Sequence, residues 1–154
     1  MYTEQDYADI CAQKSKRLIA VLIPVVLLLA LLVYSLVIRS RLISVIATIA
    51  MGILWIAGYG LFVKPVNDYR RHMDLVMHGR VRTVTGAFKE MEEQITMREG
   101  VQYYALLLNV GRMDDEADDR LFYYDANLAR PEWEKGEMLT VTHHDKALGK
   151  WERA

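Results

Sequence analysis

The sequence has little cysteine, no excess of positive charge and no motif of a known catalytic site. Its single cysteine, Cys11, excludes a disulfide within the chain and any metal site built from several cysteines. From residue 64 onward, 14 Lys and Arg stand against 17 Asp and Glu, a net charge of −3. Nucleic-acid-binding domains usually carry a basic excess that displaces counterions from phosphates, so we expect no nucleic-acid partner.

Motifs that position a phosphate, a nucleophile or a catalytic metal are also missing. The chain contains no glycine-rich phosphate loop, no Gly-x-Ser-x-Gly turn and no His-Glu-x-x-His pair. We therefore expect neither an enzyme nor a cofactor.

Two long runs without a charged residue dominate the first half of the chain. Residues 18–38 and 42–63 are each more than 20 residues long. At 1.5 Å per residue, each run covers a hydrocarbon core of about 30 Å. A secretory signal peptide would be shorter, and no small-residue cleavage site precedes Arg39. The pattern predicts an N-terminal arm over residues 1–17 and then a membrane-embedded α-helical hairpin.

Basic residues flank this hairpin on the side of both chain ends. Such residues are typical of the cytoplasmic membrane interface, although two arginines in the connecting turn oppose the bias. We predict an integral membrane protein with both termini in the cytoplasm. The residues expected at the membrane interface are Lys14, Lys16, Arg17, Lys64, Arg70 and Arg71.

Small and hydroxyl side chains recur at multiples of four along the second run. Such a face lets another helix approach closely, so it predicts packing against the first run or against a second protomer in a homo-oligomer. Neither run contains an ionisable residue of the kind that an ion path needs, so the hairpin is expected to be an anchor. The residues of this stripe are Ser44, Thr48, Gly52 and Gly60.

The second half of the chain changes from helical to strand periodicity. Residues 64–79 are expected to form a juxtamembrane helix, which either lies on the lipid headgroups or connects to the next domain. Residues 80–154 alternate with a period of two and contain a glycine, Gly86, that suggests a bulge. We predict an all-β soluble domain, a small antiparallel barrel of five to six strands of the OB or SH3-like kind.

This arrangement resembles a type of short, mostly uncharacterised bacterial membrane protein. Such proteins carry two transmembrane helices and a small C-terminal β-barrel similar to the soluble module of NfeD-like proteins. The resemblance implies a scaffolding or assembly role in a bacterial inner or plasma membrane. It rests on a strand that opens with Gly86, the apolar strand 103–108, Pro131 and the segment 136–141.

The best metal candidate is the run His143, His144 and Asp145, which stands where the resembling proteins often have Tyr-Asp-Pro. Adjacent residues of a strand point to opposite faces, so the two histidines cannot easily bind one ion. The acidic loop 114–119 lacks the ligand spacing of an EF-hand. We expect no metal and two solvated loops.

Aromatic residues are dense in the β domain, and alternation would place half of them on its outside. We predict that these and nearby arginines form a contact surface: Tyr123, Tyr124, Trp133, Trp151, Arg112, Arg120 and Arg130. Two functions fit. The chain is a membrane-anchored adaptor or assembly subunit whose β domain binds a protein partner. Alternatively, the β domain senses a small ligand such as a nucleotide and acts through oligomeric transmembrane helices. The net negative charge of the β domain favours the adaptor, because an anionic ligand would need a basic pocket.

Overall fold

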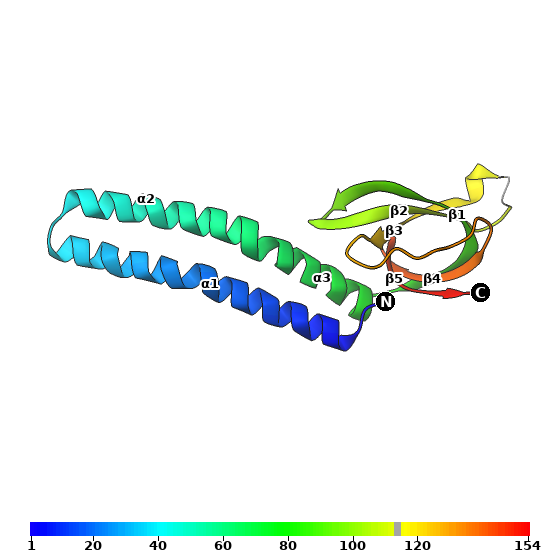
Figure 1. Cartoon of the computed structure of the whole chain (residues 1–154), viewed down its shortest axis with the longest axis horizontal. Helices are drawn as coiled ribbons and strands as arrows, with labels where there is room; N and C mark the ends of the chain where they lie inside the picture. Colours follow the sequence, from blue (N-terminus) through cyan, green and yellow to red (C-terminus); the bar gives the residue numbers. More distant parts are fainter. Residues whose placement is uncertain (113–114) are drawn as a thin grey trace. The chain divides into compact units, whose positions relative to one another are not determined.

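The structure of the chain, a computed structural model, describes residues 1–112 and 115–154. Two long helices precede a β domain, as predicted (Figure 1). The chain divides into two compact units, residues 8–68 and a second unit of Met1–Tyr7 with Tyr69–Ala154. The elements are α1 (Glu4–Val37), α2 (Arg41–Gly58), a π-turn η1 (Tyr59–Val63), α3 (Lys64–His78), β1 (Arg82–Arg98), β2 (Val101–Asn109), a 3-10 turn η2 (Glu116–Asp118), β3 (Asp119–Asp125), β4 (Met138–His144) and β5 (Ala147–Arg153).

The N-terminal arm expected at residues 1–17 is not a separate segment, because α1 already begins at Glu4. Thr3 and Asp6 start the helix by capping each other. The backbone N–H of Asp6 donates to the Thr3 hydroxyl at 3.2 Å, and that of Thr3 donates to the Asp6 carboxylate at 2.9 Å. These bonds satisfy donors that a helix N-terminus leaves free. The Thr3 hydroxyl also donates to the Asp6 carboxylate at 2.7 Å, and this bond, together with the one from the Thr3 backbone, lowers the pKa of Asp6.

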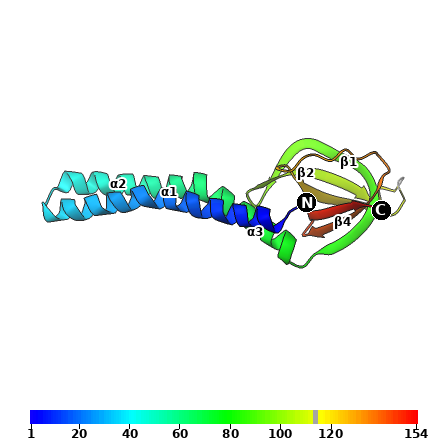
Figure 2. The same cartoon turned by 60° about the horizontal axis from the view of Figure 1, so that its bottom comes forward.

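Within the first unit, α1 and α2 lie side by side (Figures 1 and 2). Both helices are long and apolar enough to cross a membrane. The turn between them is as short as predicted, and Arg39 adopts a left-handed conformation there with φ of 53°. Ala47 of α2 is 2% exposed, and Gly58 lies so close to α1 that a Cβ atom would sit 3.0 Å from Val21 Cγ1.

The predicted stripe on the second span does not face the first span. A Cβ atom added at Gly52 or at Gly60 would meet no atom within 4 Å, and Thr48 is exposed. The hydroxyl of Ser44 donates to the Arg41 carbonyl and that of Thr48 to the Ser44 carbonyl. The face of α2 that contacts α1 instead contains Ala47, which is buried, and Gly58, which lies against Val21.

A π-turn connects the second span to the juxtamembrane helix, so that helical hydrogen bonding continues through Lys64 and Pro65. The backbone N–H of Lys64 donates to the Tyr59 carbonyl, five residues earlier. A proline ring inside a helix clashes with the carbonyl four residues before it. The wider turn moves that carbonyl away and lets α3 begin at Lys64.

The five strands form one mixed sheet that closes on itself, with pairing in the order β1-β2-β3-β5-β4 and from β4 back to β1. Figure 2 shows β1 curving around one side of it. Most neighbours are antiparallel, as predicted. The exception is β3 with β5, which run parallel and pair at Tyr123 and Ala147. The purely antiparallel prediction is therefore wrong at this one junction of the described strands.

Strand β1 is longer and more irregular than predicted. The sequence predicted a bulge at Gly86. Instead, one 17-residue strand pairs first with β4 and then with β2. Gly86 pairs regularly with Leu139, and its role is close packing, since a Cβ atom there would lie 2.7 Å from the Asn109 carbonyl oxygen. The register shifts instead between Phe88 and Glu90 and between Met91 and Ile95.

Alternating side chains of four strands fill the interior of the closed sheet. Leu106 and Leu108 of β2 are fully buried, and the two β4 residues of the core are equally inaccessible. Burial of such aliphatic side chains stabilises the fold by about 1.5–3 kcal/mol each. The core consists of Leu106, Leu108, Phe122, Tyr124, Leu139, Val141 and Leu148.

The contact between α1 and α2 is tested by placing leucine at two glycines of the second helix. Gly58→Leu should destabilise the hairpin by about 1–3 kcal/mol, because the side chain must displace Val21. Gly52→Leu meets open space and should change stability little. Thermal unfolding of the helices in detergent, followed by circular dichroism, measures both. Equal losses would contradict the assignment of the contact to the Gly58 face.

Candidate functional site

The site is centred on a carboxylate with no access to solvent. Asp125 ends β3, where it lies opposite Tyr103 of β2, and it is 0% exposed. Its Oδ1 atom accepts hydrogen bonds from the backbone and side-chain nitrogens of Asn127, both at 2.9 Å. Its Oδ2 atom remains for donors that come from outside the sheet.

Helix α3 supplies the first of these donors. The Tyr69 hydroxyl donates to Asp125 Oδ2 at 2.6 Å. His72, three residues later and on the same helical face, lies with its Nδ1 atom 3.0 Å from the Tyr103 hydroxyl. Further along, Val76 packs against Gly149 of β5, where a Cβ atom would come within 2.5 Å of the valine. The second half of α3 is therefore fixed to the sheet by polar and apolar contacts.

The N-terminal segment supplies the second donor. The Tyr2 hydroxyl donates to Asp125 Oδ2 at 2.8 Å and also lies 3.0 Å from His72 Nε2. The Met1 side chain packs against the core of the sheet. We call Tyr2, Tyr69, His72, Tyr103 and Asp125 the Asp125 cluster.

The cluster has one arrangement of protons that satisfies every contact. Because Tyr2 gives its hydroxyl proton to Asp125, its oxygen must accept a proton from His72 Nε2. His72 Nδ1 is then unprotonated and accepts from the Tyr103 hydroxyl. This arrangement needs an ionised carboxylate and a neutral imidazole.

The electrostatic environment favours a neutral His72 and protonated tyrosine hydroxyls. Burial lowers the pKa of His72, outweighing the opposite effects of Asp125 and Glu99, while His144 lowers it further. Burial and the negative charge of Asp125 both raise the pKa of Tyr2, Tyr69 and Tyr103, so all three hydroxyls stay protonated. A buried carboxylate without such donors would destabilise the fold by several kcal/mol.

A second, more exposed set of contacts joins the same two segments. The Arg70 guanidinium donates to the Tyr7 hydroxyl at 3.1 Å, and that hydroxyl donates to Asp74 at 3.3 Å. His78 lies between Asp74 and Glu4, with N–O distances of 3.3 and 3.4 Å. Arg70, expected at the membrane interface, is therefore half-buried in the β unit, whereas Arg71 is exposed.

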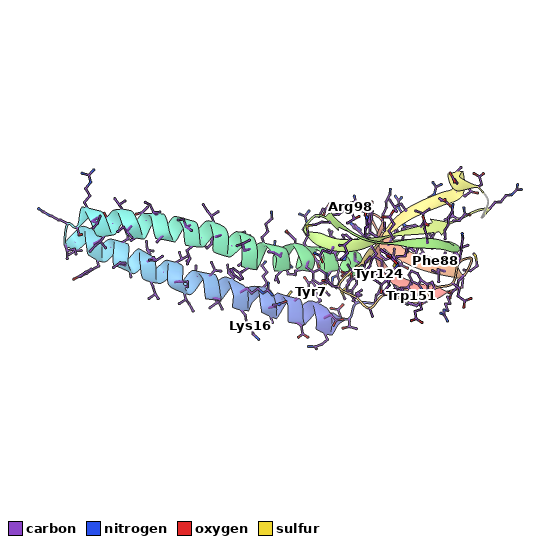
Figure 3. The ribbon with its side chains drawn as sticks, turned by 45° about the horizontal axis from the view of Figure 1, so that its top comes forward. Tyr7, Lys16, Phe88, Arg98, Tyr124 and Trp151 are labelled. Carbon is purple, nitrogen blue, oxygen red and sulfur yellow. The ribbon has the colours of Figure 1, made fainter. Side chains whose placement is uncertain are left out.

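The predicted aromatic surface is mostly internal. Tyr124 is 3% exposed and belongs to the core, so its assignment to a surface is wrong. Trp133 and Trp151 are half-buried and meet edge to face at 5.0 Å (Trp151 and Tyr124 are labelled in Figure 3). Tyr123 is half-buried beneath Arg98, whose guanidinium lies 4.3 Å from the ring centre. An open pocket lies beside Trp133 and is lined by Glu132, Lys135, Glu137 and Arg153.

The three arginines of the predicted surface have different partners. The Arg112 backbone donates to Asp118, whereas Arg120 opens β3 opposite Leu108. Arg130 donates to the Met91 carbonyl at 3.0 Å and lies 5.3 Å from the Tyr104 ring centre. These contacts do not bring the arginines to a common site.

The two histidines of the metal candidate also have separate partners. His143 lies 4.9 Å from the Phe122 ring, while His144 Nδ1 donates to the Arg80 carbonyl at 2.8 Å. Asp145 is in the turn between β4 and β5. Residues 1–112 and 115–154 contain no group of three metal-ligating side chains.

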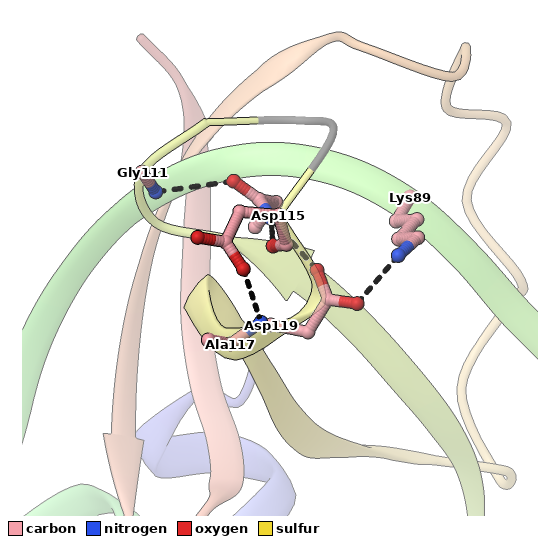
Figure 4. A network of polar contacts seen from close by, with 6 residues as sticks. Lys89, Gly111, Asp115, Ala117 and Asp119 are labelled. Atoms are coloured by element: carbon pink, nitrogen blue, oxygen red, sulfur yellow. Dashed lines mark hydrogen bonds and ion pairs between the residues drawn. The ribbon is translucent and has the colours of Figure 1, made fainter.

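The acidic loop is held by local hydrogen bonds (Figure 4). Asp115 accepts from the backbone of Ala117, and Asp119 accepts from Lys89 at 2.5 Å and from Asn109 at 2.8 Å. Hydrogen bonding to Lys89 and then to Asn109 lowers the pKa of Asp119. Asp114 lies outside the described residues. These contacts fasten the start of β3 to β1.

Sequence patterns did not identify the Asp125 cluster. No sequence pattern gave Asp125 a role, and Tyr2 was expected in the N-terminal arm over residues 1–17. A usable signal was the spacing of Tyr69 and His72 on one face of a helix that is otherwise rich in charge. Polar groups on the packed face of a helix require partners in the neighbouring domain.

Comparison with protein-family profiles, curated proteins and solved structures finds no match for this chain.

The Asp125 cluster makes stability depend on pH through His72. Its lowered pKa means that, below the ordinary value of about 6.5, the unfolded chain binds a proton that the folded chain does not. The free energy of unfolding should therefore decrease as the pH is lowered below about 6.5, by at most about 1.4 kcal/mol per pH unit. His143, whose pKa burial also lowers, contributes in the same direction.

The measurement is thermal unfolding of the full chain in detergent between about pH 5 and 8. His72→Gln keeps one donor and one acceptor but cannot titrate, so its slope should be clearly smaller than that of the unmodified protein. His78→Gln, at a more exposed position, is the control and should keep the slope. Equal slopes in the His72→Gln variant and the unmodified protein would contradict the assignment.

Proposed function

We propose that this chain is a two-span membrane protein whose β domain is an adaptor or assembly module for a protein partner. The observation that carries the proposal is the Asp125 cluster. It fastens Tyr2, which precedes the first span in sequence, and Tyr69, which follows the second, to the same buried carboxylate. The β module is therefore attached to its anchor through two chain segments, an arrangement that suits the binding of a partner at the membrane.

Exposed apolar residues support the membrane anchor. Leu27 and Leu36 of α1 are 66% and 64% exposed, and Ile56 of α2 is 75% exposed. Exposed apolar side chains along both helices are typical of a surface that faces lipid. Because Tyr2 contacts the β domain, the N-terminus and the β domain lie on one side of the membrane. The bias of Lys14, Lys16, Arg17, Lys64 and Arg71 favours the cytoplasmic side, and the NfeD-like resemblance favours a bacterial inner membrane.

The strand order supports an OB-type barrel for the β domain. OB-folds are five-stranded Greek-key barrels. Here the chain runs in sequence through β1, β2 and β3, then passes from β3 to β4 across the neighbouring β5. Residues 126–137 make this crossing, and they carry Trp133 and the open pocket beside Arg153. This loop is the partner surface we favour, because two tryptophans and mixed charges meet there.

The ligand-sensing alternative has one observation in its favour. Asp125 of the sheet is hydrogen-bonded to Tyr2 and Tyr69, which flank the hairpin in sequence. A small movement of the sheet would therefore act directly on both flanking segments. Against it, the arginines do not converge and Tyr124 is buried, so an anionic ligand has neither a basic site nor an exposed aromatic platform.

Topology is tested by cysteine labelling in a Cys11→Ser background. Ser40→Cys should react with a membrane-impermeant maleimide from outside the cell. Glu152→Cys, in the exposed part of β5, should react after permeabilisation of the membrane. The reverse pattern would contradict the proposed orientation, and labelling of both from outside would contradict the two-span anchor.

The adaptor role is tested by purifying the full chain from its own membranes in mild detergent, followed by native mass spectrometry. We expect a stoichiometric second protein, whose yield falls at least several-fold in Lys135→Glu, because that substitution reverses a charge in the exposed loop. Lys16→Glu, on exposed α1, is the control. A bound small molecule in place of a protein would support the sensor, and a partner retained by Lys135→Glu would contradict the loop as its binding surface.

A further inference from the structure

The second half of β1 is a strand edge without a partner. Strand β4 pairs with β1 over residues 82–87, and Phe88 exchanges backbone hydrogen bonds with Gly136 and Glu137. Arg130 then occupies the Met91 carbonyl. Beyond it, no strand of the described chain pairs with residues 92–98 on the side away from β2.

This edge is exposed and partly apolar. All residues from Glu92 to Arg98 are exposed, and Ile95 and Met97 are 53% and 64% exposed. The register shift between Met91 and Ile95 also releases the intervening residues from pairing with β2. Unpaired backbone groups beside exposed apolar side chains favour the addition of another strand.

The sequence of the edge is complementary to itself. If two copies pair antiparallel about a two-fold axis at Gln94, and the partner strand takes the place of Arg130 at the Met91 carbonyl, Glu90 of one copy lies opposite Arg98 of the other. Met91 then lies opposite Met97. The same register sets Glu92 opposite Thr96 and Glu93 opposite Ile95, so no carboxylate faces another. Opposite charges that face each other across strands stabilise pairing, and like charges oppose it.

The faces of the strand agree with this register. Met91, Ile95 and Met97 pair with Leu106, Tyr104 and Gln102 of β2, so the odd-numbered side chains share one face. Glu90 and Arg98 share the other face, which would bring them together on one side of the joined sheets. Arg98 lies near the end of the β1–β2 hairpin (Figure 3) and is exposed.

We infer that the partner of this edge is a second copy of the chain, joined through antiparallel pairing of β1 around Gln94. A two-fold contact of this kind uses the same patch on both protomers. The interface therefore contains two Glu90–Arg98 pairs, one on each side of the axis. The inference concerns contact between copies and does not rest on the proposed protein partner.

Charge exchange tests the register in the full-length protein. Glu90→Arg sets two arginines opposite each other, and Arg98→Glu sets two glutamates opposite each other. Each should weaken dimerisation in detergent by about tenfold or more, since two pairs change from attraction to repulsion. The double variant restores both pairs and should return the dissociation constant to within about threefold of the unmodified protein. Sedimentation velocity over a concentration series gives these constants, and circular dichroism confirms that each variant is folded.

Disulfide trapping gives an independent test in a Cys11→Ser background. Gln94→Cys lies on the axis, where opposed Cα atoms are about 4.5–5.5 Å apart, so oxidation should link two chains. Thr85→Cys, on the part of β1 already paired with β4, is the control and should stay monomeric. The inference would be overturned if the protein stayed monomeric at all concentrations, or if neither charge reversal changed the dissociation constant of the dimer. Equal disulfide formation at positions 94 and 85 would overturn it as well.

Discussion

A buried carboxylate must be surrounded by donors, and this requirement organises the β unit of the molecule. Asp125 has no contact with solvent, and its four hydrogen bonds come from its own turn, from α3 and from the N-terminal segment. Removing any one segment would leave the charge partly unsatisfied, at a free-energy cost of about 1–3 kcal/mol per lost donor. Three parts of the chain that are distant in sequence are therefore interdependent.

This requirement explains why the β unit includes both flanks of the hairpin. Tyr2 and Tyr69 are separated by the entire pair of apolar helices, yet they share one oxygen atom of Asp125. The sheet itself provides the remaining surfaces. We propose the loop around Trp133 as a site for a partner and the open β1 edge as a site for a second copy. The two proposed contacts therefore use separate parts of the β unit.

Local patterns predicted the elements well and the contacts between them poorly. Uncharged runs located both long helices, and period-two alternation located the strands, because each signal lies within a few residues. The parallel pairing of Tyr123 with Ala147 depends on strand order, which no local pattern contains. Tyr124 was placed on the surface because alternation gives two faces without saying which is inside. Gly52 was placed in the packing stripe by its spacing of four from Thr48, whereas the orientation of α2 turns Gly58 toward α1.

A double-mutant cycle between Tyr2 and Asp125 tests the central claim most directly. Tyr2→Phe removes one donor, and Asp125→Asn removes the charge while keeping the shape of the side chain. Unfolding free energies of the full chain in detergent should show a coupling energy of at least about 0.5 kcal/mol, since the two groups share a buried hydrogen bond. Additive effects, within about 0.3 kcal/mol, would show that the N-terminal segment is not held by Asp125 and would contradict the account.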